Sequence, residues 1–190
     1  MDRISSQHAQ RGLVALLLLT LAACAKPEPP LPLFGLVPEF TLTSEQGQAF
    51  GSHQLIGRPW IAAFIYTTCP GPCPRMSKLM MGLQNETSNV NLVSFTIDPA
   101  HDTPPVLAEY AKRYKADPKR WTFLTGPVET LHKLNREAFK LGDVNGSLDH
   151  STRLVLVDPF LNVRGYYGTS DDEGLAQLKI DLGKLAKEKR

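Results

Sequence analysis

Apolar residues along the chain fall into two patterns, continuous runs typical of buried strands and helically spaced stripes typical of amphipathic helices. The residues from Trp60 to Tyr66 form a nearly continuous apolar run, which predicts a strand buried on both faces of a sheet. After Pro74 the period changes, and apolar side chains recur at i, i+3, i+4 and i+7 over Met76, Leu79, Met80 and Leu83. We therefore expect a helix that packs one apolar face against the sheet.

The same two patterns alternate along the rest of the chain. Strands are expected over residues 89–97, 121–124, 152–157 and 163–167, and a short hairpin over residues 40–43 and 48–50. Helix-start residues at Thr103 with Pro104, at Pro127 and in the capping-box pattern Ser170–Glu173 predict three further helices. This order predicts an α/β fold that resembles the thioredoxin fold: a three-layer sandwich with a central mixed sheet, an N-terminal hairpin and an inserted strand and helix.

Composition adds two limits to this picture. The chain has 190 residues, of which 42% are hydrophobic, and this suffices for one domain with a core. The formal net charge of +2 gives no sign of nucleic-acid binding. Basic residues gather only at the C-terminal end, where cations suit the end of a helix: Lys184, Lys187, Lys189 and Arg190.

The first residues are typical of a bacterial export signal rather than of the fold. Arg3 and Arg11 precede an apolar run from Leu13 to Leu21, which is too short to span a bilayer comfortably. The run ends in Leu21-Ala22-Ala23-Cys24, which is similar to a lipobox, the motif whose cysteine is lipidated and becomes the new N-terminus. The alternative is a plain secretory signal followed by an incidental cysteine.

A proline-rich segment follows Cys24 and would act as an extended spacer. We therefore divide the chain into a lipoprotein signal peptide (1–23), a lipidated tether (24–33) and a folded domain (34–190). The expected location is the cell envelope. The domain would be lipid-anchored to a membrane and would face the periplasm or another extracytoplasmic space.

Setting Cys24 aside leaves one thiol pair, Cys69 and Cys73, at the corner between the buried strand and the helix. Cys73 precedes Pro74 and is predicted to cap the helix, where free backbone N–H groups and the helix dipole favour a thiolate. Thiolates serve both disulfide exchange and soft-metal binding. A structural disulfide is the third interpretation, which is disfavoured at an exposed corner that needs no cross-link.

His150 stands just before the strand expected over residues 152–157. If that strand runs antiparallel to the strand from Trp60 to Tyr66, it starts at the sheet edge that carries the two cysteines. Two thiolates and one imidazole form a soft trigonal set, which suits Cu(I) and can hold Cu(II), whereas structural zinc takes four ligands. Cys69, Cys73 and His150 are therefore predicted metal ligands.

Four ordered segments resemble the Sco/SenC family. They are TCPGPCP at 68–74, FTIDPAHDTP at 95–104, WTFLTG at 121–126, and DHS at 149–151 leading to LVDP at 156–159. The resemblance as a whole covers most of the chain beyond the tether, with these segments in the family's order. The resemblance implies a membrane-tethered, thioredoxin-fold copper metallochaperone that helps to assemble CuA, the binuclear copper centre of cytochrome c oxidase.

By the same resemblance, Cys69, Cys73 and His150 take the family's copper-binding roles. The implied partner is the copper-bearing subunit of the oxidase, or another copper or thiol acceptor. Many family members carry an aspartate between the two cysteines, where this chain has Pro70-Gly71-Pro72. This departure removes a negative charge and stiffens the loop, so the family's affinity and its Cu(I)/Cu(II) preference do not carry over.

A second hypothesis makes the chain a thiol–disulfide oxidoreductase. One cysteine of the pair would attack and the other would resolve, with the cysteines of a copper acceptor as one candidate substrate. A peroxiredoxin-like peroxidase is disfavoured because the sequence has no clear separate resolving cysteine and no peroxide-activating arginine pattern. His150 separates the first two hypotheses, since copper needs a third ligand and disulfide exchange does not.

Other residues that can bind metals have simpler interpretations. Core packing is favoured for three methionines: Met76, Met80 and Met81. Solvation is expected for three histidines that lack neighbouring ligands in the sequence: His53, His101 and His132. Asp98 and Asp102 are expected to shape a turn or a helix start, with partner docking as the alternative.

Overall fold

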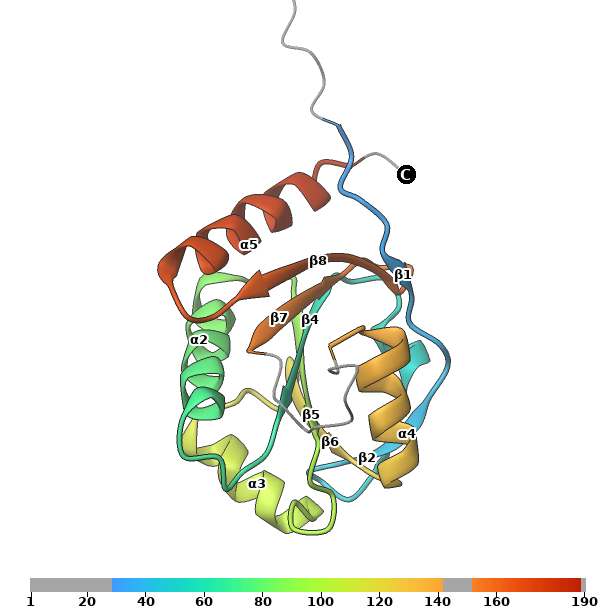
Figure 1. The fold of residues 1–190 in the computed structure, drawn as a ribbon, viewed down its shortest axis with the longest axis vertical. Coiled ribbons are helices and arrows are strands. Elements are labelled where there is room, and N and C mark those ends of the chain that lie inside the picture. Colours follow the sequence, from blue (N-terminus) through green and yellow to red (C-terminus); the bar gives the residue numbers. More distant parts are fainter. Residues whose placement is uncertain (1–28, 142–151, 189–190) are drawn as a thin grey trace, which may run out of the picture.

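A mixed sheet of eight strands forms the centre of the protein in a computed structural model, which describes residues 29–141 and 152–188 (Figure 1). The strands lie in the order β1-β8-β7-β4-β5-β6-β2-β3. Their bounds are β1 Gly35–Leu36, β2 Thr41–Ser44, β3 Ala49–Gly51, β4 Trp60–Ile65, β5 Asn91–Thr96, β6 Trp121–Thr125, β7 Arg153–Val157 and β8 Asn162–Gly168.

Helices cover both faces of this sheet (Figure 1). Their bounds are α2 Pro72–Glu86, α3 Pro104–Arg113, α4 Val128–Lys133 with a following π-helical turn Leu134–Ala138, and α5 Asp172–Leu185; a short 3-10 helix covers Ser52–Leu55. Within the described ranges, none of these helices combines the length and the hydropathy needed to cross a bilayer.

The strand directions confirm the predicted mixed sheet. β4, β5 and β6 run parallel, β7 pairs antiparallel with β4, and β8 pairs antiparallel with β7. The hairpin of β2 and β3 joins the sheet through an antiparallel contact between β2 and β6. The thioredoxin-like arrangement, the N-terminal hairpin and the inserted α3–β6 unit are therefore all present.

Alternate side chains of β4 enter two separate apolar layers. Ile61 and Ile65 share one layer with α2, α3 and α5, whereas Trp60 and Phe64 share the other with α4. Every residue of β4 is at most 3% exposed. Burial on both faces explains why this strand is apolar throughout instead of alternating with polar residues.

Two helix boundaries differ from the sequence expectation. α5 is capped by Asp171, whose carboxylate accepts the Gly174 N–H at 3.2 Å, and not by Ser170; a carboxylate is the stronger acceptor for an N-cap N–H. The helix expected from Pro127 onward does not stay regular, because the Phe139 N–H donates to the Leu134 carbonyl, five residues back, and forms the π turn.

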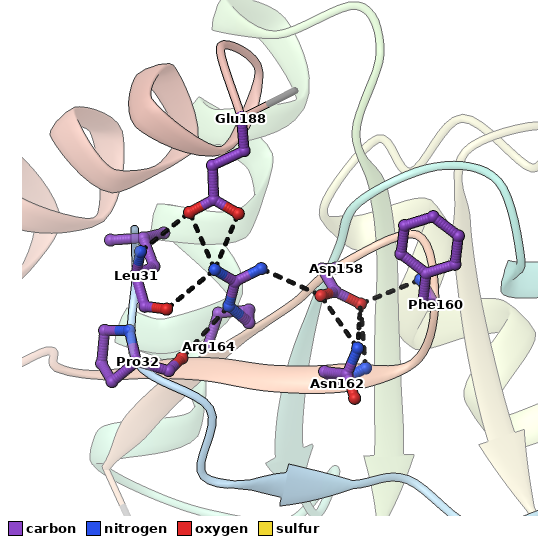
Figure 2. A network of polar contacts seen from close by, with 7 residues as sticks. All are labelled: Leu31, Pro32, Asp158, Phe160, Asn162, Arg164 and Glu188. Carbon is purple, nitrogen blue, oxygen red and sulfur yellow. Dashed lines mark hydrogen bonds and ion pairs between the residues drawn. The ribbon is translucent and has the colours of Figure 1, made fainter. Parts of the chain in front are cut away.

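A buried arginine joins the start of the described chain to its end (Figure 2). The Arg164 guanidinium, 7% exposed, donates to Asp158 Oδ2 at 3.0 Å and to Glu188 Oε2 at 2.7 Å. It also donates to the carbonyls of Leu31 at 2.8 Å and Pro32 at 3.1 Å, and the Leu31 N–H donates to Glu188 at 2.8 Å. We call these five residues the Arg164 network. It pairs a charge that would be costly to bury alone.

The packed chain begins inside the segment 24–33 that the sequence assigns to the tether. Leu31 is buried in the layer below α5, and the Arg164 network fixes its backbone. The predicted signal peptide (1–23) and the predicted lipidation site Cys24 lie outside the described residues. The point at which the chain leaves the domain is therefore set by contacts at Leu31 and Pro32.

Replacing Arg164 with methionine should lower the free energy of unfolding by about 3 kcal/mol, because it leaves the buried Asp158 carboxylate without its cation. Urea denaturation measures this loss. The matched control is Arg58→Met at an exposed position, which should change stability by no more than about 0.5 kcal/mol. Equal, small effects of the two substitutions would contradict a structural role for the Arg164 network.

Candidate metal centre

The two predicted thiol ligands lie together at the C-terminal end of β4. Cys69 is in the loop after β4 and Cys73 is in the first turn of α2, and both are buried free thiols. The structure corrects the predicted cap, since Gly71 and not Cys73 is the N-cap of α2. Pro72 suits a first helical position as well as Pro74 does, so the helix begins earlier. The Cys73 N–H then donates to the Cys69 sulfur at 3.4 Å.

Backbone groups at the start of α2 therefore affect the ionisation of the Cys69 thiol. Burial opposes ionisation of the Cys69 thiol, but hydrogen bonds outweigh burial and lower its pKa below the ordinary value. They come from the backbone at Cys73 and Gly71 and from the side chains of Cys73 and Tyr66. In return, the hydrogen bond to Cys69 is the main reason why the pKa of Tyr66 is raised. Free amides at a helix start stabilise an anion in this way.

Cys73 has the opposite character. Burial raises the pKa of Cys73 to about 12; a backbone hydrogen bond at Tyr66 opposes the shift, while Cys69 and the charge of Asp102 add to it. The pair therefore combines one thiol whose pKa is lowered with another that keeps its proton at neutral pH. An asymmetric pair can act as nucleophile and resolving thiol, whereas a metal bound to both sulfurs must displace the proton of Cys73.

A buried carboxylate holds the loop that carries the thiols. Asp102 is fully buried and accepts hydrogen bonds from the Thr67 N–H at 3.1 Å, from the Thr67 hydroxyl and from the Thr96 hydroxyl at 2.6 Å. His101 Nδ1 lies 3.1 Å from Oδ1 of the Asp102 carboxylate. Thr67 is two residues before Cys69, so Asp102 fixes the chain just ahead of the first thiol.

The sequence predicted only part of this role. The Asp98 carbonyl accepts the N–H groups of His101 and Asp102, which confirms a turn. The side chain of Asp102, however, lies under the thiol loop instead of shaping the turn. The missed signal was a pair of hydroxyl residues, Thr67 just after β4 and Thr96 at the end of β5.

The third predicted ligand, His150, lies outside the described residues. The topological premise for it is confirmed, because β7 runs antiparallel to β4 and begins, at Arg153, near the end of β4 that precedes the thiols. Within residues 29–141 and 152–188, no three His, Cys, Asp or Glu side chains are grouped closely enough to hold a metal ion. Of the three predicted ligands, the described part of the chain thus contains the two thiols.

The other residues of metal-binding types lie in the core or at the surface of the described part of the chain. Met76 and Met80 are fully buried in the core, as predicted, and Met81 packs against its edge. His53 and His101 are exposed. The expectation that His132 is solvated was wrong: it is half-buried on α4, with Nδ1 beside Arg136 at 3.4 Å and Nε2 enclosed.

Known proteins share both the sequence pattern and the fold. The chain matches the SCO1/SenC family model over residues 32–181. It is 36% identical to the SCO1 protein homolog of Bacillus subtilis over 121 residues, which cover 61% of this chain and 63%, less than two thirds, of that protein.

Two crystal structures are similar over most of the chain. A SCO1/SenC family lipoprotein from Bacillus anthracis has a TM-score of 0.72 and 28% identity, covering 83% of this chain and 99% of that one. Yeast Sco1 with copper bound has a TM-score of 0.64 and 25% identity, covering 82% of this chain and 95% of that one.

Alkylation of the reduced, metal-free protein should modify Cys69 before Cys73. The thiolate is the reactive form, Cys69 has the lowered pKa, and Cys73 is the more deeply buried thiol. Because the thiolate fraction rises with pH, the rate at Cys69 should level off at a lower pH than the rate at Cys73. Tandem mass spectrometry after timed iodoacetamide pulses resolves the two sites. Faster modification of Cys73 at neutral pH would contradict the assigned asymmetry.

Asp102→Asn should lower the free energy of unfolding by about 3 kcal/mol, because an amide nitrogen would face donors that the carboxylate accepts. It should also speed alkylation of the thiols by loosening the loop at Thr67. The matched control, Asp98→Asn, changes a half-exposed residue of the same loop and should do neither. Chemical denaturation and the alkylation assay give the two readouts, and equal behaviour of the two variants would refute the role of Asp102.

Proposed function

The chain belongs to the SCO1/SenC family, and we propose that it is a membrane-tethered copper metallochaperone that holds one copper ion through Cys69, Cys73 and His150. The observation that carries this proposal is the buried thiol pair at the start of α2, where the pKa of one sulfur is lowered and both sulfurs lie on one loop and helix turn. Soft thiolate ligands select copper in its reduced state, and an imidazole lets the set also accept Cu(II).

The site suits transfer as well as binding. A site with two thiolates and one imidazole keeps coordination positions open, so an incoming thiolate of an acceptor can replace one ligand at a time. The proposed acceptor is the copper-bearing subunit of cytochrome c oxidase, in which the CuA centre is assembled, or another copper or thiol protein. The copper-bound structure of yeast Sco1 supports copper as the cargo.

The proposed location follows from the beginning of the chain. Lipidation at Cys24 would anchor the domain to a membrane of the cell envelope, facing the periplasm or another extracytoplasmic space. The Bacillus anthracis relative is a SCO1/SenC family lipoprotein, which supports this assignment. A proline-rich tether keeps the domain close to the membrane without joining it rigidly.

A second function is supported by the asymmetry of the pair. Cys69, with its lowered pKa, could attack a disulfide, and Cys73 could then resolve the mixed disulfide. Such a thiol–disulfide oxidoreductase would reduce the cysteines of an acceptor, which must be reduced before they can take copper. Copper delivery and reduction would use the same two residues, and only copper binding would need His150.

Copper titration of the reduced protein should show one copper bound per chain, seen in the thiolate-to-copper absorption and by metal analysis. Cys69→Ser and Cys73→Ser should abolish stoichiometric binding. His150→Ala should weaken it at least by the about 10- to 100-fold that loss of even an outer-shell partner costs. The matched control is His53→Ala, an exposed histidine away from the thiol loop and from Asp102, which should leave the titration unchanged.

Each negative result has its own meaning. No stoichiometric binding by the wild-type protein would overturn the metallochaperone function. If His150→Ala binds copper with wild-type affinity, His150 is not a copper ligand, and the thiols remain the proposed ligands. Turnover of a disulfide substrate by the copper-free protein, unaffected by His150→Ala, would favour the oxidoreductase.

A further inference from the structure

Exposed apolar side chains gather where the chain enters the domain. In the described part of the chain, five of the seven large apolar residues that are exposed lie in two short N-terminal segments and the turn between β7 and β8: Leu33, Phe34, Leu36, Ile56 and Phe160. The other two, Val128 and Ile180, lie on α4 and α5. Single exposed apolar residues are ordinary, but a group of them marks a contact surface.

Backbone hydrogen bonds bring these segments together. Leu36 pairs with Asn162 across β1 and β8, and the Val37 N–H donates to the Leu161 carbonyl at 2.9 Å. The Gly57 N–H, next to Ile56, donates to the Pro159 carbonyl at 2.9 Å. Leu36, Ile56 and Phe160 therefore lie around one turn. Leu33 precedes Phe34, whose N–H donates to the Val163 carbonyl at 2.9 Å on the neighbouring strand, and we call the surface of Leu33, Leu36, Ile56 and Phe160 the tether-end surface.

Basic side chains border this surface. Arg58 follows Ile56 and is exposed, and Lys187 is exposed just beyond the end of α5. A hollow of about 290 Å³ is lined by Gly57, Phe160, Ala186 and Glu188 among others, which places the end of α5 beside the turn. Exposed apolar side chains bordered by cations suit the interface of a membrane that contains anionic lipids.

The length of the tether sets how far this surface can lie from the membrane. Six residues separate Cys24 from Leu31, and the Arg164 network holds Leu31 and Pro32 beside the tether-end surface. A fully extended chain of this length reaches at most about 25 Å. A short tether of this kind turns membrane contact into an intramolecular event with a high effective concentration, so even a weak surface is occupied.

From these observations we infer that the tether-end surface rests on the bilayer interface and that the Arg164 network fixes this orientation. The inference rests on the lipid anchor of the proposed function. Val157, just before Asp158, pairs with Trp60 at the start of β4, whereas the thiols follow the end of β4. A six-residue strand of about 20 Å separates the two ends. The thiol pair therefore faces away from the membrane, toward acceptors in the aqueous space.

Tryptophan quenching in vesicles tests the orientation. The lipidated full-length mature protein, with its lipid confirmed by mass spectrometry, is reconstituted into phosphatidylcholine and phosphatidylglycerol vesicles with or without brominated phosphatidylcholine. Phe160→Trp puts a reporter on the tether-end surface. Val128→Trp is the matched control, because α4 follows the end of β6, which runs parallel to β4, and so lies at the thiol end of the sheet. The native Trp60 and Trp121 are fully buried and give a constant background.

The expected result is a blue shift and loss of the added fluorescence in brominated vesicles for Phe160→Trp, and no loss for Val128→Trp. Membrane-bound protein with no quenching at residue 160, or equal quenching at both sites, would overturn the orientation and leave the lipid anchor standing. A blue shift without quenching would overturn it in favour of contact with a second copy or another protein. A mature protein without lipid would overturn both the anchor and the orientation.

Discussion

A buried carboxylate, Asp102, is the constraint on which the arrangement of the thiol site depends. It accepts hydrogen bonds from Thr67, two residues after β4, and from Thr96, the last residue of β5, and it stands two residues before α3. A carboxylate removed from water must have its acceptors filled, so these segments can meet in few ways. The loop that leaves β4 is thereby fixed at Thr67 and delivers Cys69 to the start of α2. The position of the first thiol is thus a consequence of satisfying a charge beneath it.

The same carboxylate contributes to the difference in pKa between the two thiols. Cys73 is buried and lies within the field of Asp102, and both effects keep its proton in place. Cys69 receives the amides at the start of α2 and ionises more readily. Burial, with a smaller contribution from the Asp102 charge, and hydrogen bonds at the start of α2 thus shift the pKa values of the two thiols in opposite directions. The second charged centre, the Arg164 network, lies at the other end of β4. It fixes the residues with which the chain enters the domain and does not contact the thiols.

Much of the fold was predictable because it rests on periodicity and short-range signals. The continuous apolar run of β4 and the stripe of α2 are recorded in neighbouring residues, and the crossover order limits the sheet to few topologies. The Arg164 network and the role of Asp102 were not predictable in this way, because they join residues far apart in sequence. Leu31 and Glu188 meet across nearly the whole domain. The cap of α2 was misplaced by a local ambiguity, since Pro72 and Pro74 both suit a helix start.

The Pro70-Gly71-Pro72 loop contains both the N-cap of α2 and a backbone group that lowers the pKa of Cys69. Gly71 caps α2 with a negative φ of −133°, and a Cβ built on it would meet no other atom within 4 Å. The space around this Cβ therefore gives no packing reason for a glycine at this position. The consequence of a loop without the aspartate of many relatives is electrostatic, because the backbone at Gly71 helps to stabilise the Cys69 thiolate and a carboxylate there would compete with it. With a neutral loop, burial opposes the ionisation of Cys69, and hydrogen bonds from the backbone at Cys73 and Gly71 and from the side chains of Cys73 and Tyr66 favour it. These hydrogen bonds favour the anionic sulfur that both copper binding and disulfide exchange require.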